Sequence, residues 1–212
     1  MPKLLSPNSR FYDSWNNAAN LVLINLLTLI FTIPLITAGA AFAATARVAC
    51  EMVREEDTYV IRTWLRAFRE NFQLATLAWI PAALLLLGFW YEERLLGNFT
   101  DPRLSGMLLG VILFGVAIII SFLCWYFPLI ARYRNSFGAH LANAFRLMLG
   151  RLPQTLLCVG LCFTPAMLVV FFPKTLLPVC VFMVIIGVAF IAYLIALIQK
   201  STFARLDITG LD

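Results

Sequence analysis

The sequence predicts an all-α fold: a single integral membrane domain, residues 1–212, formed by a polytopic bundle of about five transmembrane helices. Three observations predict this class. Apolar residues make up 62% of the chain and charged residues only 13%, whereas soluble domains are about half apolar and a quarter charged. The apolar residues gather in long runs, with the basic residues mostly between them. Two short basic segments also resemble one another, which suggests an internal repeat.

Five apolar stretches reach the length of about 20 residues that a helix needs to cross the hydrocarbon core. None of them contains Asp, Glu, Lys or Arg, as expected where a charge at mid-bilayer is costly. The first is interpreted as retained rather than as a cleaved signal segment, because it is long and a later span matches it. The predicted spans are residues 18–36, 73–91, 106–131, 154–172 and 176–198.

The lysines and arginines predict the orientation of these spans. Eleven of the 16 fall between spans one and two, between spans three and four, or after span five. Basic residues concentrate on the cytoplasmic side of membrane proteins. The distribution therefore places the N-terminus outside and the C-terminus in the cytoplasm of a multi-pass membrane protein.

The segment TWLRAFRENF, residues 63–72, predicts an amphipathic helix that begins after Asp57 or Thr58, either of which would serve as N-cap. Its apolar residues recur at helical spacing and its arginines occupy the other side. We expect this helix to lie in the cytoplasmic interface and to contact anionic headgroups or a docking partner. The residues assigned to that role are Arg62, Trp64, Arg66 and Arg69, with Arg146 in the second segment.

The second segment, LANAFRLML, repeats the AFR triplet 77 positions later and is expected to start at Asn135 as N-cap. Each segment follows a Pro-Leu-Ile sequence, at Pro34 and Pro128, and precedes a span. We therefore predict two parallel repeats, residues 18–91 and 106–172, followed by an unpaired fifth span at 176–198. The first repeat carries an Ala-rich, helix-prone insertion at about residues 38–54.

A small set of polar and helix-breaking residues lies within or beside the spans. Asn25 stands at mid-span, where an amide seeks a hydrogen-bond partner on another helix. Proline ends or kinks a helix, and Thr37 and Gly39 suit a corner after Pro34. The residues predicted to have a structural or interhelical role are Asn25, Pro34, Thr37, Gly39 and Pro128. Gly106 and Gly110 form GxxxG, which favours close helix packing and makes a homo-oligomer an expectation.

The sequence predicts no catalytic residue, no metal site and no cofactor. It lacks the nucleotide-binding, metalloprotease and serine-hydrolase motifs. His140 is the only histidine, and we expect it to be solvated or in contact with headgroups. The acidic residues from Glu51 to Asp57 read as a solvated loop, and the four cysteines in apolar runs read as small buried hydrophobes. A net charge of +5 without a basic, aromatic face excludes nucleic acid as a partner.

The stretch NLLTLIFTIPLITAG, with Asn25, Pro34, Thr37 and Gly39, resembles the opening signature of the YesL family of bacterial integral membrane proteins. TYVIRTWLRAFRENFQLATL and ARYRNSFGAHLANAFRLMLGRLPQTLL resemble its later blocks, so the resemblance covers roughly residues 11–205. The family is poorly characterised and was formerly filed as a domain of unknown function. Its genes often neighbour carbohydrate-uptake ABC transporters and saccharide-degrading enzymes. The resemblance therefore implies a bacterial plasma membrane location and an accessory part in sugar uptake.

Two hypotheses of different classes follow. The first is a non-enzymatic accessory or scaffold protein that works with ABC sugar transporter permease subunits in the lipid bilayer. The second is a small transporter or channel for a neutral solute, since charge-free spans argue against ion coupling. A membrane-embedded enzyme acting on lipid or glycan is a third, weaker alternative that depends on His140 and the acidic residues 51–57.

Overall fold

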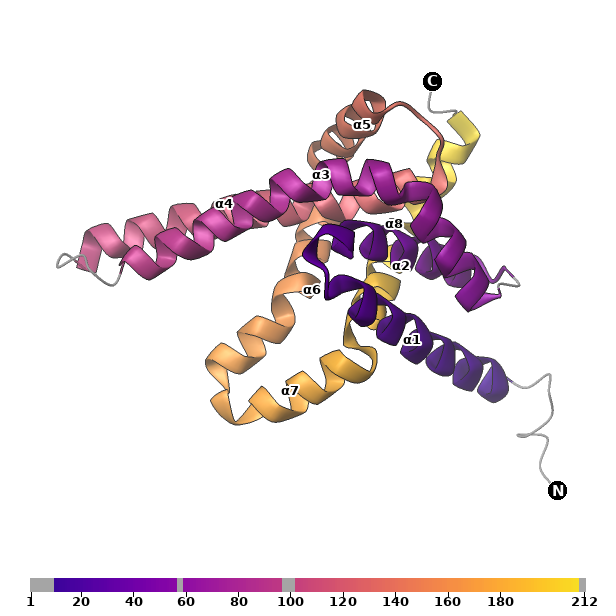
Figure 1. Ribbon diagram of the computed structural model, residues 1–212, viewed down its shortest axis with the longest axis horizontal. Helices are drawn as coiled ribbons and strands as arrows, with labels where there is room; N and C mark the ends of the chain where they lie inside the picture. The colour runs from indigo at the N-terminus through magenta and orange to yellow at the C-terminus, as the bar shows by residue number, and fades with distance from the viewer. Residues whose placement is uncertain (1–9, 57–58, 97–101, 210–212) are drawn as a thin grey trace.

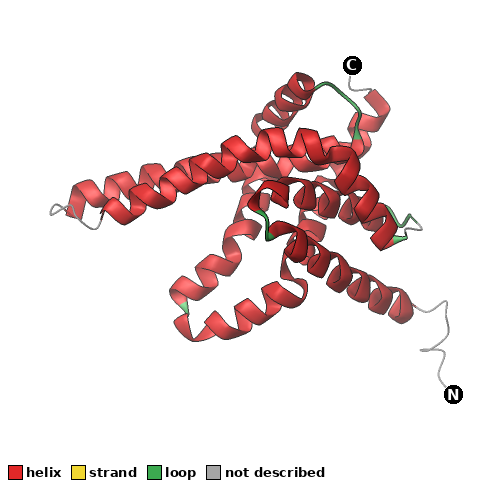
Figure 2. Ribbon diagram, in the orientation of Figure 1, coloured by secondary structure: helices red, strands yellow, loops and turns green. Residues whose placement is uncertain are grey.

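The computed structural model describes residues 10–56, 59–96 and 102–209. Within these ranges the chain is helical apart from short turns and contains no strand (Figure 2), which confirms the predicted all-α fold. The helices are α1 Arg10–Thr32, α2 Ala38–Val53, α3 Val60–Leu96, α4 Pro102–Arg132, α5 Phe137–Gly150, α6 Leu152–Phe171, α7 Leu176–Phe182 and α8 Val188–Thr209. Turns of 3-10 helix at Leu35–Thr37 and Pro173–Thr175 precede α2 and α7, and a π-helical segment, Met183–Gly187, joins α7 to α8.

Five stretches of the described chain are long and apolar enough to cross a membrane, so the predicted number of spans is confirmed. The first member of the set differs from the prediction. The apolar part of α1, Asn16–Thr32, is shorter than the other candidates, and the stretch that contains α2 qualifies instead. The five stretches are Leu35–Val53, Val60–Glu92, Arg103–Arg132, Leu152–Phe171 and Pro173–Ile208.

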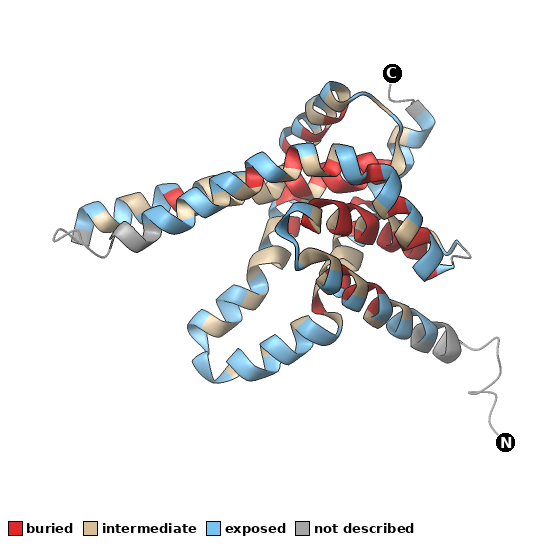
Figure 3. Ribbon diagram, viewed as in Figure 1, coloured by how far each residue is buried: buried red, intermediate tan, exposed pale blue. Residues whose placement is uncertain are grey.

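Helix α2 is the centre of the bundle. It contacts α1, α3, α4 and α8, and 78% of its apolar window is buried, against 11–17% for the other four candidate spans. Figure 3 shows this concentration of buried residues in α2 and in the parts of α3 and α4 beside it. Alanines supply most of its surface, and small residues allow neighbouring helices to approach closely. Helix α2 is therefore surrounded by protein, whereas the other spans keep broad lipid-facing surfaces.

The turn between α1 and α2 is formed by Pro34 and Thr37. Helix α1 ends at Thr32, because the residue before a proline disfavours the helical conformation. The Thr37 hydroxyl donates to the carbonyl oxygens of Phe31 and Pro34, and the second of these hydrogen bonds is 2.8 Å long. The Trp79 indole of α3 donates to the Leu35 carbonyl over 2.8 Å. The bond to Phe31 satisfies a carbonyl group that the end of α1 leaves without a helical donor. The other two bonds hold the turn and attach it to α3.

Helices α1 and α2 are antiparallel, which changes the predicted orientation and repeat. Thr28 bonds Thr45, while Leu21 and Ile24 pack near Val48 in one core cluster. Helix α1 consequently runs opposite to α4, and the predicted parallel repeat is wrong in this respect. The prediction treated residues 38–54 as an insertion, but they form the helix that reverses the chain.

The same reversal places the start of α1 at the arginine-rich end of the bundle, which we call the basic end. There α2 ends, α3 begins, and α4 and α8 end (Figure 1). Asn16 and Asn20 of α1 line a hollow together with Arg62 and Arg69 of α3. The described part of α1 therefore begins at the end of the bundle where α8 ends.

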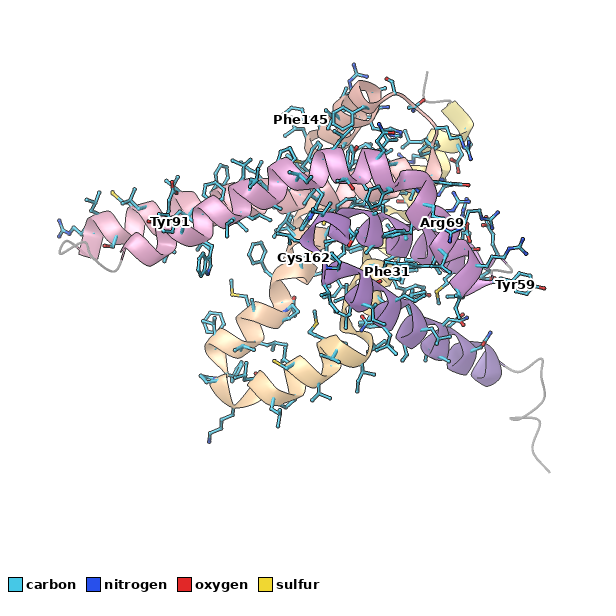
Figure 4. The ribbon with its side chains drawn as sticks, in the orientation of Figure 1. Phe31, Tyr59, Arg69, Tyr91, Phe145 and Cys162 are labelled. Carbon is cyan, nitrogen blue, oxygen red and sulfur yellow. The ribbon has the colours of Figure 1, made fainter. Side chains whose placement is uncertain are left out.

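Two helical hairpins diverge from the centre. Helices α3 and α4 form one long arm, and α6 with α7 forms a shorter one (Figure 1). The predicted interfacial helix is the first part of α3 and is continuous with the following span. The ribbon nevertheless bends sharply just after the part that carries Arg69 (Figure 4). The predicted caps, Asp57 and Thr58, lie outside the described residues.

Helix α5 is the second predicted amphipathic helix. It is exposed at Phe145 and Arg146, and its buried residues are His140, Ala144 and Met148. Its N-cap is Ser136, whose hydroxyl accepts from the Ala139 amide over 3.3 Å. The prediction of Asn135 as N-cap is wrong by one residue. Pro128 lies inside α4, which continues to Arg132, so the second Pro-Leu-Ile sequence does not form the corner that Pro34 forms.

Candidate functional site

A polar groove of about 1060 Å³ opens at the basic end, between α2, the first part of α3 and the connection from α4 to α5. We call it the docking groove. Arginine and glutamate side chains from all three parts of the chain meet there. Its charged lining residues are Arg47, Glu51, Arg66, Glu70, Arg132 and Arg134, and Asn71, Asn135 and Ser136 add uncharged polar groups.

Arg47 and Glu51 form the inner wall of the groove. The Arg47 Nε atom lies 2.6 Å from Glu51 Oε1, and Arg47 Nη1 donates to the Ala131 carbonyl over 2.8 Å. That carbonyl belongs to the last turn of α4, where no helical donor remains. Glu51 is buried within α2, so the prediction of a solvated loop is wrong for this residue. The pair joins α2 to α4, and its charges are already compensated.

Arg132 is likewise satisfied within the fold. Its guanidinium forms an ion pair with Asp207 of α8 and lies 5.3 Å from the centre of the Phe203 ring. The Tyr133 hydroxyl donates to the other carboxylate oxygen of Asp207 over 2.7 Å. These contacts hold the end of α8 against the end of α4. Arg132 therefore positions the groove wall.

Arg66 and Arg134 remain available at the mouth of the groove. Arg66 is exposed. The Arg134 side chain is 91% exposed, and its closest carboxylate is Glu70, 3.7 Å away and 52% exposed. An exposed pair at that distance contributes roughly 0–1 kcal/mol, so an incoming carboxylate or phosphate can replace Glu70 at little cost. The groove thus combines a satisfied inner wall with exposed cationic groups at its mouth.

The predicted headgroup or docking residues do not all share this surface. Arg62, Arg66 and Arg69 are exposed on α3, and Arg146 is exposed on α5 away from the groove. Trp64 is fully buried, so its predicted interfacial position is wrong. Its indole donates to the Thr45 hydroxyl over 3.1 Å, and its ring stacks on Phe68 at 5.4 Å.

His140 is also fully buried, contrary to the expectation of solvation or headgroup contact. Its Nε2 accepts from the Asn135 backbone N–H over 3.3 Å, and Nδ1 has no hydrogen-bond partner in the described chain. The Tyr126 ring lies edge-on at 6.4 Å. Burial lowers the pKa of His140, because a charged imidazole loses hydration inside the protein. His140 supports the docking of α5 on α4.

Asn25 of α1 bonds the π-helical segment between α7 and α8. Its amide nitrogen donates to the carbonyls of Met183 and Val184 over 3.1 and 2.8 Å, and its oxygen accepts from the Ala189 N–H over 3.0 Å. A π-helical segment interrupts the regular ladder of the helix. Asn25 supplies partners for the backbone groups that this interruption leaves free.

An apolar cavity of about 340 Å³ lies deeper, among α2, α3, α4, α6 and α8. Phe42, Trp79 and Phe127 contribute to its wall, together with thiol groups. The Cys124 and Cys162 sulfur atoms are 3.8 Å apart at this cavity. Cys180 on α7 is exposed, so the prediction of buried cysteines fails there. The lining has little polarity and does not match the hydroxyl groups of a saccharide.

Sequence reasoning missed the Arg47–Glu51 pair and the Arg132–Asp207 pair. The first has a recognisable signal, since opposite charges four residues apart support a helix. Asp207 lies 75 positions after Arg132, and nothing in the sequence alone connects them. In the described residues, no group of three or more His, Cys, Asp or Glu side chains is placed to hold a metal ion.

The fold and its basic groove define a polytopic helical membrane protein with a cationic surface at one end. The model of the family described as "Protein of unknown function, DUF624" matches residues 21–92. The matched stretch includes most of α1, all of α2 and most of α3. No curated protein and no solved structure matches the chain. The family match supports a relationship to an uncharacterised family and specifies no activity.

Proposed function

We propose that this chain is a non-enzymatic accessory protein of the bacterial plasma membrane that docks a cytoplasmic segment of a membrane partner in the docking groove. The observation that carries the proposal is the charge arrangement there. Arg66 and Arg134 are exposed above a wall whose other charges are paired. Such a surface favours an acidic segment, since complementary charges speed association and select the partner.

The proposed partner is a permease subunit of a carbohydrate ABC transporter. The resemblance of NLLTLIFTIPLITAG and the two later blocks to the YesL family supports this choice, because genes of that family neighbour such transporters. The match of residues 21–92 to a family of unknown function agrees with an accessory part but names no partner. Arginines concentrate at the basic end, which supports a cytoplasmic location for that end and for both ends of the described chain.

Purification from native membranes in mild detergent, followed by quantitative mass spectrometry, tests the proposal. We expect an ABC permease to be recovered with the tagged protein. Arg134→Glu should reduce that recovery by at least about tenfold, because like charges would then meet in the interface. Arg146→Glu makes the same change on α5 outside the groove and should leave recovery unchanged. Recovery without a permease, or an equal loss with both variants, would overturn docking in this groove.

The second candidate is a small transporter or channel for a neutral solute. The apolar cavity of about 340 Å³ among five helices is the observation that favours it. Its walls suit an apolar solute better than a sugar. Liposomes that contain the protein should then release an entrapped solute faster than protein-free liposomes loaded with the same solute. Filling the cavity with Ala46→Phe should abolish the difference. Purification as a defined homo-oligomer without other proteins would make this assay the next step.

A further inference from the structure

A second hollow at the basic end, of about 930 Å³, separates the first half of α1 from the start of α3. We call it the α1–α3 groove. Its floor is mostly apolar and includes Leu23 of α1 with Ile61 and Leu65 of α3. Leu23 and Ile61 remain 43% and 49% exposed. Beyond this point α1 is predominantly apolar.

Three arginines border this floor. Arg62, Arg66 and Arg69 follow one another at helical spacing on the same side of α3, and each is exposed. In the part of the chain that the structure describes, none of the three has a carboxylate within ion-pair distance. Like charges one turn apart repel and destabilise a helix. A bound anion would remove this repulsion.

The opposite wall supplies uncharged polar groups. Asn16 and Asn20 of α1 face the groove across from the arginine side, and Tyr59 lies at its edge. Figure 4 shows Tyr59 just before α3 and Arg69 on its first part, at the basic end of the molecule. Amide groups donate to phosphate and hydroxyl oxygens. Glu70 also lines the groove, so three arginines face one carboxylate there. The groove therefore presents a net positive charge and hydrogen-bond donors at its mouth and apolar side chains along its floor.

We propose that the α1–α3 groove binds one anionic phospholipid of the cytoplasmic leaflet. The phosphate lies against Arg62, Arg66 and Arg69, and an acyl chain lies on Leu23, Ile61 and Leu65. An amphiphile with a single anionic head matches both parts of this lining, whereas an acidic peptide would leave the apolar floor exposed to water. Basic side chains near the cytoplasmic leaflet are attracted to its anionic lipids. The inference goes beyond partner docking and does not depend on it.

The test is native mass spectrometry of the purified protein titrated with phosphatidylglycerol or phosphatidylcholine. We expect phosphatidylglycerol to bind at one site. The double variant Arg62→Gln/Arg69→Gln should bind it with at least about tenfold lower affinity. These two arginines line only this groove, so the docking groove keeps Arg66 and Arg134. Arg146→Gln/Lys200→Gln removes the same charge from exposed positions elsewhere and should bind as the unaltered protein does.

A second variant tests the floor without changing charge. Leu23→Trp should fill the groove and weaken the binding of phosphatidylglycerol, although all three arginines remain. Equal affinity for both lipids, or equal binding by the arginine variant and its control, would overturn the proposal. Displacement of the lipid by inorganic phosphate or by a poly-glutamate peptide at similar concentration would also overturn it, because the apolar floor would then contribute nothing.

Discussion

The side-chain amide of Gln199 in α8 donates a hydrogen bond to the Cys124 carbonyl in α4 over 3.0 Å. Pro128 lies four residues after Cys124 and has no N–H group to occupy that carbonyl. Gln199 therefore provides the donor that the proline removes from the helix. The bond also fixes α8 beside α4, close to the end where Arg132 and Asp207 pair.

This relationship predicts a dependence between Gln199 and Pro128. Gln199→Leu should lower the free energy of unfolding by about 1 kcal/mol, the usual size of an interhelical hydrogen bond in a membrane protein. Pro128→Ala restores a backbone donor to Cys124, so the same Gln199 change should cost less in that background. Denaturation in detergent micelles of the four variants measures the coupling. Strictly additive losses would show that Gln199 does not compensate for the proline.

Gly39 predicts a second effect on stability. A Cβ atom at this position would lie 2.5 Å from Trp79 Cβ and 2.9 Å from the Ala75 carbonyl oxygen. Gly39→Ala should therefore separate α2 from α3 and destabilise the protein by about 1–3 kcal/mol, as overpacking does. Thermal unfolding in detergent measures this loss.

Gly160→Ala is the matched control for that variant. Gly160 lies inside α6, and no atom outside its own helix lies within 4 Å of a Cβ built there. Alanine has the better helix propensity, so this change should leave the melting temperature unchanged or raise it. A fall of the same size in both variants would contradict the close approach at Gly39.

Asn25 predicts a loss localised to the π-helical segment. Asn25→Leu removes three hydrogen bonds to backbone groups of residues 183–189. With about 0.6–1.7 kcal/mol for each such bond, the protein should lose about 2–5 kcal/mol. Hydrogen exchange should increase most at residues 183–189. Asn20 lies on the same helix and is partly exposed, so Asn20→Leu should have a small effect on stability and on hydrogen exchange. Equal exchange at residues 183–189 in both variants would contradict the role assigned to Asn25.

The fold class and the number of spans follow from the sequence because lipid-facing helices keep long runs without charge. Helix α2 could not be recognised in this way. Arg47 and Glu51 make its residues look like part of a cytoplasmic loop, although the two charges compensate each other inside the protein. Each crossing reverses the direction of the chain. Because α2 was not counted as a crossing, the predicted direction of α1 was also reversed.

The first part of α3 shows a finer limit. Its apolar residues recur at helical spacing, but the buried side is centred on Trp64, Ala67 and Asn71. Ile61 and Phe72 are exposed where lipid is available to cover them. Hydropathy alone does not separate contact with lipid from contact with α2. The docking groove could not be predicted from the sequence for a related reason, because its wall is formed by residues from three separated segments.

His140 predicts a pH dependence whose sign follows from burial. The pKa of the buried imidazole is lowered, so the unfolded chain binds a proton more readily than the folded chain between that pKa and the ordinary value of about 6.5. The contribution of neutral His140 is fully present above about pH 6.5 and is lost as the pH falls through the lowered pKa. The melting temperature should therefore decrease between pH 7.5 and 5.5. His140→Gln keeps an acceptor for the Asn135 N–H but does not titrate, so its melting temperature should change less over this range. An equal decrease in the variant would mean that another group controls the acid sensitivity of the contact between α4 and α5.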